Sequence, residues 1–334
     1  EHEVVDALFL RERADLQQLM VSGGVSQSLD LICSLYTRPG TLVVVEDPTY
    51  FLALRIFEDH GLRVASVPTG PEGMDVDALE TLLRRETPAF VYTIPSFQNP
   101  RGFCMSDERR RRLVELAVRD GFKIVADEVY RPLRYSGTPT TPFAEIEGSE
   151  QVFSLGSFSK ILGPGLRLGW IRSTSRSLHR LVTCGQLDSG GGINAFTASV
   201  VKSALASGDM DAHLQRLRTV YSARMRTLAG ALEEEFSDLG DFSLPEGGYF
   251  LWVTLRRGLT AETLARAARE EGLRFLPGNR CSPNDGQGAA GRKGSAPEPQ
   301  KASAAGDEIA AGKGSAAERE KASDGGDETG AGKG

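Results

Sequence analysis

The chain has 334 residues, of which 40% are hydrophobic and 25% are charged, and its formal net charge is −6. This composition is typical of a globular protein with one large core or with two domains that share a cleft. The mixed charges argue against a nucleic-acid-binding surface, and no apolar run reaches the length of a membrane-spanning helix. We therefore expect neither a nucleic acid nor a membrane as a partner.

Apolar runs of strand length alternate with segments of helical periodicity in the first half of the chain. Strands are predicted at residues 41–46, 62–68, 89–94 and 122–127, and helices at 50–61, 75–86 and 106–121. Because the strands are almost continuously apolar, we expect both of their faces to be buried. The alternation predicts an α/β fold with a doubly wound, mainly parallel sheet, which binds ligands at the carboxyl ends of its strands.

A long helical stretch follows the predicted sheet. Residues 193–236 keep a helical period with one break near Gly208, which predicts a helix that bridges into a second domain. In that domain, strands are predicted at 247–255 and 273–277 and a helix at 260–272. The segment is short for an independent core. We therefore predict a large domain over residues 1–192 and a smaller, incomplete α+β domain over residues 193–281.

The last segment, residues 282–334, differs in composition from the rest of the chain. It consists largely of Gly, Ala, Ser, Lys, Glu and Asp, and the sequence KGSA at Lys293 recurs at Lys313. A segment with so few apolar residues cannot bury enough surface to offset its ordering entropy. We predict a disordered, protease-sensitive tail of low complexity.

The cysteines and the first residues show no sign of secretion. Cys33, Cys104, Cys184 and Cys281 are far apart and lack CxxC spacing, which predicts free thiols and no metal site. The first residues are acidic and mixed, without the basic segment and apolar stretch of a signal peptide. Both features favour a cytoplasmic location.

A lysine and two serines occur near the end of an apolar strand in the stretch SLGSFSKILGPGLRLGW, residues 154–170. Lys160 comes just after Ser157 and Ser159, and Arg167 follows seven residues later. A lysine at the end of a strand can form a Schiff base with a carbonyl cofactor. The two hydroxyls and the guanidinium suit a phosphate dianion, which an arginine can bind bidentately. Taken alone, Lys160 also fits a surface residue and Arg167 an ion-pair residue.

Two glycines precede a predicted helix near residue 25. Gly23 and Gly24 leave the first amides of that helix, at Val25 and Ser26, free to bind an anion, because helix N-termini attract negative charge. An ordinary glycine-containing turn between a strand and a helix explains the same residues equally well.

Polar residues follow three further strands. Asp127 ends the apolar run at 122–127, and Tyr130 comes three residues later. A buried carboxylate needs a cationic partner or hydrogen bonds, and a protonated pyridine nitrogen is such a partner. Asn99 and Tyr50 follow two other strands, and such side chains hydrogen-bond a ring hydroxyl or stack on a ring face. A helix cap, an ion pair and plain turns are the alternatives.

In this order and combination, the residues resemble the fold-type I, pyridoxal-phosphate-dependent aminotransferases of class I/II. The resemblance extends over about residues 21–277. It is greatest to the branch with the aminoadipate and kynurenine aminotransferases and the aminotransferase-like domains of MocR regulators. The resemblance implies pyridoxal 5'-phosphate as cofactor and a homodimer. It also implies transfer of an amino group between an amino acid and a 2-oxo acid through a Schiff base on Lys160.

The resemblance implies a role for each candidate residue. Lys160 is expected to be the covalent anchor and the general acid/base, and Asp127 the partner of the pyridine nitrogen. The expected contacts to the rest of the cofactor are Asn99 and Tyr130 to the ring 3-oxygen, Tyr50 to the ring face, and Val25, Ser26, Ser157, Ser159 and Arg167 to the phosphate. Of these residues, Lys160, Asp127 and Tyr130 are the expected catalytic residues.

The chain departs from the family pattern near both ends. Family members carry an arginine, in a strand near the C-terminus, that binds the substrate α-carboxylate. Here the repetitive tail occupies that region, and neither Arg280 nor Arg292 lies in such a strand. Little sequence precedes Val21. We therefore expect weak turnover with a high KM. The alternatives are a regulatory module that binds the cofactor without turnover, a lyase or decarboxylase of the same fold type, and a truncated, non-functional product.

Overall fold

The computed structural model describes residues 15–256 and 258–283. All of these described residues belong to one compact unit. Apart from Ser282 and Pro283, the predicted tail lies outside the described residues. The predicted division into residues 1–192 and 193–281 stays a prediction.

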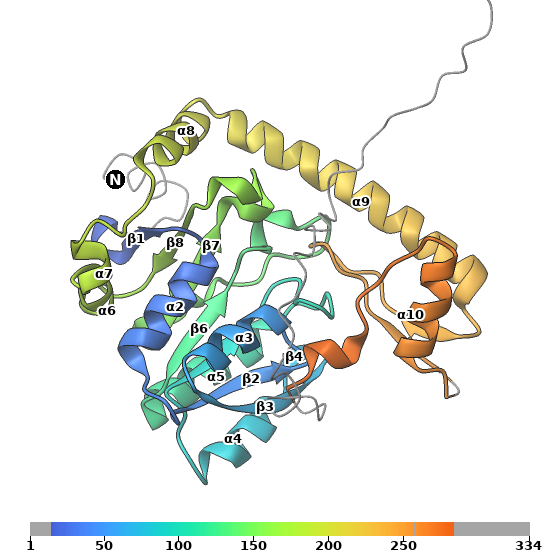
Figure 1. The fold of residues 1–334 in the computed structure, drawn as a ribbon, viewed down its shortest axis with the longest axis horizontal. Helices are drawn as coiled ribbons and strands as arrows, with labels where there is room; N and C mark the ends of the chain where they lie inside the picture. The colour runs from blue at the N-terminus through green and yellow to red at the C-terminus, as the bar shows by residue number, and fades with distance from the viewer. Residues whose placement is uncertain (1–14, 257, 284–334) are drawn as a thin grey trace, which may run out of the picture. The chain divides into compact units, whose positions relative to one another are not determined.

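Eight strands form one sheet in the order β1-β8-β7-β6-β5-β2-β3-β4 (Figure 1). The strands are β1 (Leu19–Ser22), β2 (Leu42–Asp47), β3 (Arg63–Gly70), β4 (Gly73–Met74), β5 (Phe90–Thr93), β6 (Lys123–Asp127), β7 (Val152–Ser157) and β8 (Gly169–Arg172). The five central strands pair in parallel, and β1, β4 and β8 pair antiparallel at the edges. The sheet is therefore mainly parallel, as the sequence predicts.

Helices pack against both faces of this sheet. They are α2 (Val25–Tyr36), α3 (Phe51–Asp59), α4 (Val76–Leu83), α5 (Asp107–Asp120), α6 (Ser175–Val182) and the short α7 (Gly185–Asp188). Val43 and Val45 of β2 belong to the apolar cluster that includes α2, α3 and α6, whereas Val44 belongs to the cluster that includes α4 and α5. Because alternate side chains of a strand point to opposite faces, two buried faces require a continuously apolar strand. The doubly wound fold is confirmed.

Short 3₁₀ helices occupy several of the connections. They are η1 (Leu16–Gln18), η2 (Arg131–Leu133), η3 (Phe143–Glu145), η4 (Ser149–Gln151), η5 (Phe158–Lys160), η6 (Pro164–Leu166) and η7 (Gly278–Cys281).

The order of the strands reverses at β2, because β3 lies on one side of it and β5 on the other. In such sheets ligands bind at the carboxyl ends of the strands beside the reversal. Tyr50 follows β2, Asn99 follows β5, Asp127 ends β6 and Lys160 ends the turn after β7. The parallel pairing of these four strands therefore brings the four candidate residues to one edge of the sheet.

The second half of the described chain begins with two helices. Helix α8 (Ala195–Ala206) and helix α9 (Asp209–Phe236) are separated at Gly208, whose φ of 80° is a conformation that glycine adopts readily. The predicted break at Gly208 is confirmed. Strands β9 (Gly240–Phe242) and β10 (Val253–Leu255) then form an antiparallel pair, and helix α10 (Ala261–Glu270) follows. Within the described residues, no helix is both long and apolar enough to cross a membrane.

Two strand predictions in this half are wrong. Residues 273–277 are irregular, and of residues 247–255 only Val253–Leu255 form a strand. A strand needs a partner, and β9 is the only strand that pairs with β10 within the described ranges. Leu273 is 63% exposed, so no sheet face buries the apolar run at 273–277.

Candidate active site

Lys160 and Asp127 are electrostatic neighbours at the carboxyl edge of the sheet. Lys160 is half-buried, and burial lowers the pKa of its amine while the nearby Asp127 raises it. Asp127 is 4% exposed, and its Oδ2 accepts a hydrogen bond of 3.0 Å from the Tyr92 hydroxyl. Its Oδ1 is buried and has no hydrogen-bond partner among the residues that the structure describes. Burial raises the pKa of Asp127 to about 6.

The unpartnered oxygen has a chemical consequence. A buried carboxylate oxygen without a donor costs free energy, since it has lost its water and gained nothing in return. A protonated ring nitrogen placed at Oδ1 of Asp127 would remove this cost. The geometry therefore fits a cationic heteroaromatic partner for Asp127.

Strand β8, which lies between β1 and β7, brings the N-terminus of α2 close to the turn that carries Lys160. Gly169 of β8 pairs with Ser22 of β1 on one side and with Ser157 of β7 on the other. A Cβ atom on Gly169 would lie only 2.9 Å from Cα of Gly24, so this approach requires glycine at position 169.

Arg167, Ser159 and the first turn of α2 lie together and form a cradle that could hold an anion. Arg167 donates from Nη2 to the Gly23 carbonyl at 3.1 Å and from Nη1 to Oγ of Ser159 at 3.5 Å. Among the described side chains, none caps α2. The amides of Val25 and Ser26 lie in the first turn of the helix, where amides have no intrahelical acceptor. They are therefore open to an anion beside the guanidinium.

Ser157 is placed differently from the other phosphate candidates. Its hydroxyl accepts a hydrogen bond of 3.1 Å from the Ser159 amide and lies 3.4 Å from the Leu168 carbonyl oxygen. It thus caps η5 and shapes the turn before Lys160. Its assignment as a phosphate ligand stays a prediction.

Asn99, Tyr130 and Tyr50 gather around Asp127. The Asn99 side chain hydrogen-bonds Tyr130, whose pKa is raised by burial, by the charge of Asp127 and by Tyr50. Burial and Asp127 also raise the pKa of Tyr50, while Arg167 lowers it. The structure thus brings these predicted residues together with Asp127 and Arg167.

Sequence reasoning missed three aromatic residues of this site, Tyr92, Tyr249 and Phe250. The Tyr249 hydroxyl donates to the Lys160 carbonyl, and the rings of Tyr249 and Phe250 each lie edge-on to Tyr130 with centroids 5.6 Å apart. The paired glycines before Tyr249 were the available signal, because glycines often mark close approach of a backbone to another segment.

Glu46 ties together the loops that follow β2 and β5. This residue is fully buried, and it accepts hydrogen bonds from the Thr93 hydroxyl at 2.6 Å, the Ile94 amide at 3.1 Å and Nε2 of Gln98 at 3.2 Å. Nε2 of Gln98 also donates to the Pro48 carbonyl at 2.8 Å. Burial raises the pKa of Glu46 to about 7 from an ordinary value of 4.5.

Replacing Glu46 with Gln is expected to change the pH dependence of stability. In the folded chain Glu46 binds its proton more tightly than in the unfolded chain, so its contribution to the free energy of unfolding falls as the pH rises from 4.5 to 7. The fall is on the order of 3 kcal/mol. Glu46→Gln stays neutral, so its unfolding free energy, measured in urea at several pH values, should rise relative to wild type over this range. The same dependence of the unfolding free energy on pH in Glu46→Gln and in wild type would contradict the prediction.

Comparison with known proteins identifies the family to which this site belongs. The family model for aminotransferase class I and II matches residues 7–288. The chain belongs to the class I and II aminotransferases. It is therefore a pyridoxal-phosphate-dependent enzyme of transamination. The predicted family, cofactor and type of reaction are confirmed, and the assignment of Lys160 stays a prediction.

Two curated relatives and one solved structure illustrate the similarity. Aromatic-amino-acid aminotransferase 1 of Thermococcus litoralis is 37% identical over 81% of this chain and 67% of its own length. The 2-aminoadipate transaminase of Thermus thermophilus is 36% identical over 81% of this chain and 68% of its own length. The crystal structure of LysN, α-aminoadipate aminotransferase, from the same species covers 85% of this chain and 73% of its own, with a TM-score of 0.79 and 33% identity.

The described residues of this aminotransferase fit pyridoxal phosphate. The cofactor has a pyridine nitrogen, which suits the unpartnered Oδ1 of Asp127, and an aldehyde, which suits the amine of Lys160. Its phosphate suits the cradle of Arg167 and the α2 amides.

Arg167→Gln is expected to weaken pyridoxal phosphate binding by about 100-fold or more. A charge-assisted hydrogen bond contributes roughly 1.5 to 3 kcal/mol, and the guanidinium can donate two. The dissociation constant, measured by quenching of protein fluorescence, checks the prediction. Arg63→Gln, at the start of β3 where Arg63 pairs with Glu86, should bind as tightly as wild type. Equal affinities for Arg167→Gln and wild type would remove Arg167 from the cradle.

Proposed function

We propose that this aminotransferase uses Lys160 as the covalent anchor of its cofactor and as the group that moves the substrate proton. One observation carries the proposal. The half-buried amine of Lys160 lies within electrostatic reach of the buried Asp127, whose Oδ1 has no partner within the described part of the chain. This pair offers an amine and an unsatisfied carboxylate oxygen at the carboxyl edge of the sheet.

The two residues divide the chemistry between them. When bound, pyridoxal phosphate supplies an electron-withdrawing ring that stabilises negative charge at the substrate Cα. Asp127 holds a proton at the ring nitrogen by accepting it as a hydrogen bond at Oδ1. Nζ of Lys160 would be free to take the proton from Cα once the substrate amine has displaced it from the cofactor. Because burial lowers its pKa, more of the amine is then neutral and able to accept a proton.

The surrounding residues bind the cofactor and orient it. Arg167, Ser159 and the amides of Val25 and Ser26 hold the phosphate, and Asn99 and Tyr130 hold the ring 3-oxygen. Tyr50 covers the ring face. Tyr249 and Phe250 pack against Tyr130 and help to exclude water from the site.

The substrates are an amino acid and a 2-oxo acid, and the relatives suggest which donors to try first. Their names include aromatic amino acids and 2-aminoadipate. Arg280 of η7 lies over the ring of Phe51, 5.8 Å from its centroid, and the Thr49 amide donates to the Cys281 carbonyl at 2.8 Å. Arg280 is thus held near the turn that carries Tyr50, while Arg292 lies outside the described residues. The expected weak turnover with a high KM stays a prediction.

The experiment that tests the proposal starts with purified protein and pyridoxal phosphate. We expect a visible absorbance band, an adduct that borohydride reduction fixes on Lys160, and pyridoxamine phosphate after addition of an amino acid. The panel of donors includes aromatic amino acids and 2-aminoadipate. An adduct on another lysine would overturn the assignment of Lys160. Carbon dioxide or ammonia without pyridoxamine phosphate would instead favour a decarboxylase or a lyase.

We also propose that the enzyme is a homodimer in the cytoplasm. Phe196 and Val200 lie one turn apart on α8 and are 79% and 44% exposed, an apolar pair that a second copy would bury. Sedimentation of the purified protein should give the mass of two chains. A monomer at micromolar concentration would contradict the dimer.

A further inference from the structure

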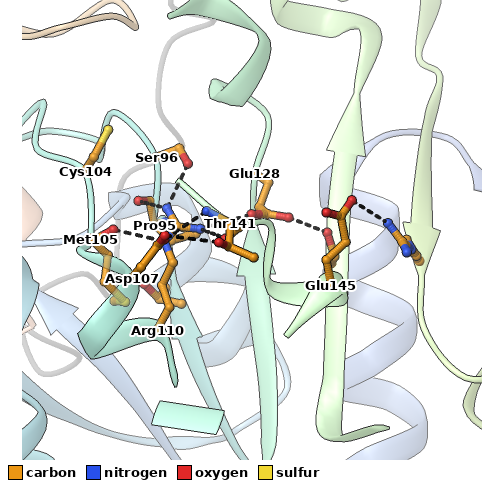
Figure 2. A network of polar contacts seen from close by, with 12 residues as sticks. Pro95, Ser96, Cys104, Met105, Asp107, Arg110, Glu128, Thr141 and Glu145 are labelled. Carbon is orange, nitrogen blue, oxygen red and sulfur yellow. Dashed lines mark hydrogen bonds and ion pairs between the residues drawn. The ribbon is translucent and has the colours of Figure 1, made fainter. Parts of the chain in front are cut away.

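Arg110 of α5 is fully buried. It lies within a network of polar contacts (Figure 2). A guanidinium has five N–H donors, and each of them can be matched to an acceptor in the structure. The acceptors are the Met105 carbonyl (2.9 Å from Nε), the Thr141 carbonyl (3.1 Å) and Oε1 of Glu128 (3.4 Å, both from Nη1), and the Pro95 carbonyl (2.6 Å) and Oγ of Ser96 (3.1 Å, both from Nη2). Arg110 is therefore held in one position.

The acceptors lie on segments that lead to the proposed active site. Pro95 and Ser96 begin the loop between β5 and Asn99. Glu128 directly follows Asp127, and its Oε2 accepts a hydrogen bond of 2.6 Å from Oγ of Ser154 on β7. Strand β7 runs on into the turn that ends at Lys160. One buried ion pair thus connects the segments that follow β5 and β6 with strand β7.

Asp127 and Glu128 are neighbours in the chain, and their side chains contact different residues. Asp127 bonds Tyr92 and lies near Lys160, whereas Glu128 bonds Arg110 and Ser154. Asp127 and Glu128 are joined by one peptide bond. The contacts of the Glu128 side chain therefore restrain the backbone that carries Asp127. Arg110 also compensates the negative charge of Glu128 beside Asp127.

Stability alone does not explain a charged pair at this place. Replacement of a buried ion pair by apolar residues of similar volume is often neutral or stabilising, since both charges must lose their water. A fully bonded pair that connects the loop after β5, the segment after β6 and strand β7 instead serves geometry, where a shift of 1 Å can cost about 100-fold in rate.

We propose that Arg110 and Glu128 are positioning residues for transamination. Neither touches the cofactor or the substrate. Together they set the placement of Asp127 and of the loops that carry Asn99 and Lys160. The inference rests on the proposed roles of Asp127 and Lys160.

The test compares holoenzyme variants by steady-state kinetics and by the circular dichroism of the bound cofactor, which reports the orientation of its ring. Arg110→Met should lower kcat by at least tenfold, leave the KM of the amino donor within twofold, and change the cofactor band. The matched control is Arg112→Met, on the exposed side of the same helix, where Arg112 pairs with Glu80. Arg112→Met should equal wild type in all three measurements.

Glu128→Gln tests the same ion pair with almost no change in side-chain shape. If Arg110→Met does not fold, the kcat and cofactor dichroism of Glu128→Gln test the inference alone. Its kcat should fall at least threefold at unchanged KM. In Arg110→Met/Glu128→Gln, removal of the uncompensated carboxylate should restore part of the kcat that Arg110→Met loses. Wild-type kcat and cofactor dichroism in Glu128→Gln, or no recovery in the double variant, would overturn the inference. Absence of the visible band in wild type would instead refute the proposed function itself.

Discussion

Lys160→Ala is expected to reduce the rate of transamination by roughly 10³-fold or more. General acid–base catalysis by one positioned group contributes about 10² to 10⁴, and the covalent anchor of the cofactor is lost as well. The phosphate cradle of Arg167 and the α2 N-terminus is untouched, so the variant should still bind pyridoxal phosphate. Borohydride reduction followed by peptide mapping should find no cofactor on the protein. Single-turnover spectra with an amino acid should show very slow formation of pyridoxamine phosphate.

Lys123→Ala is the matched control for this result. Burial also lowers the pKa of the Lys123 amine, but Lys123 begins β6 and its Nζ donates to the Glu150 carbonyl at 3.2 Å. It lies at the opposite end of the strand from Asp127. A lowered pKa by itself therefore does not mark a catalytic lysine, and Lys123→Ala should keep the adduct and the rate. If Lys160→Ala kept a trappable adduct, the anchor would be another lysine.

The sheet was predictable because its strands are buried on both faces. The run from Leu42 to Val45 is apolar and buried at every position, and the helices between the strands show their own period. The region after residue 247 was not predictable in the same way. There, Gly247 and Gly248 pack against Phe97, where a Cβ atom would clash, and this contact between distant segments overrides the local apolar pattern. The local sequence pattern predicts helices and strands well only where it also indicates which segments they pack against.

The candidate site was predictable where chain order and strand ends coincide. Asp127 ends β6 and Lys160 follows β7, so parallel pairing alone brings them to one edge. Tyr92 and Arg110 could not be found this way, since both lie inside elements and act through contacts across the sheet and the adjoining helix. Tyr92 is a tyrosine in an apolar strand, and Arg110 is one of four consecutive arginines. Nothing in the sequence around either residue indicates these contacts.

Asp127→Asn is expected to slow turnover by roughly 10² to 10³ while sparing cofactor affinity. A neutral amide cannot hold a proton at a pyridine nitrogen as a carboxylate does. The ring therefore withdraws fewer electrons, and the charge at Cα is less well stabilised. Loss of one preorganised electrostatic contact typically lowers the rate by about 10² to 10³. Affinity depends mainly on the phosphate cradle of Arg167 and Ser159, which the substitution leaves unchanged. Stopped-flow absorbance separates binding from proton removal, and turnover within a few-fold of wild type would remove Asp127 from this role.

Tyr92→Phe provides a graded test of the same carboxylate. The Tyr92 hydroxyl donates to Oδ2 of Asp127 and lowers its pKa, which burial has raised to about 6. Loss of this donor disfavours the ionised form, so the pKa of Asp127 should rise. In the cofactor-free protein, the pH at which the Asp127 carboxyl ionises, followed by carbon-13 NMR of that carboxyl, should then be higher in Tyr92→Phe than in wild type. An ionisation of Asp127 at the same pH in Tyr92→Phe and in wild type, or at a lower pH in the variant, would contradict the prediction.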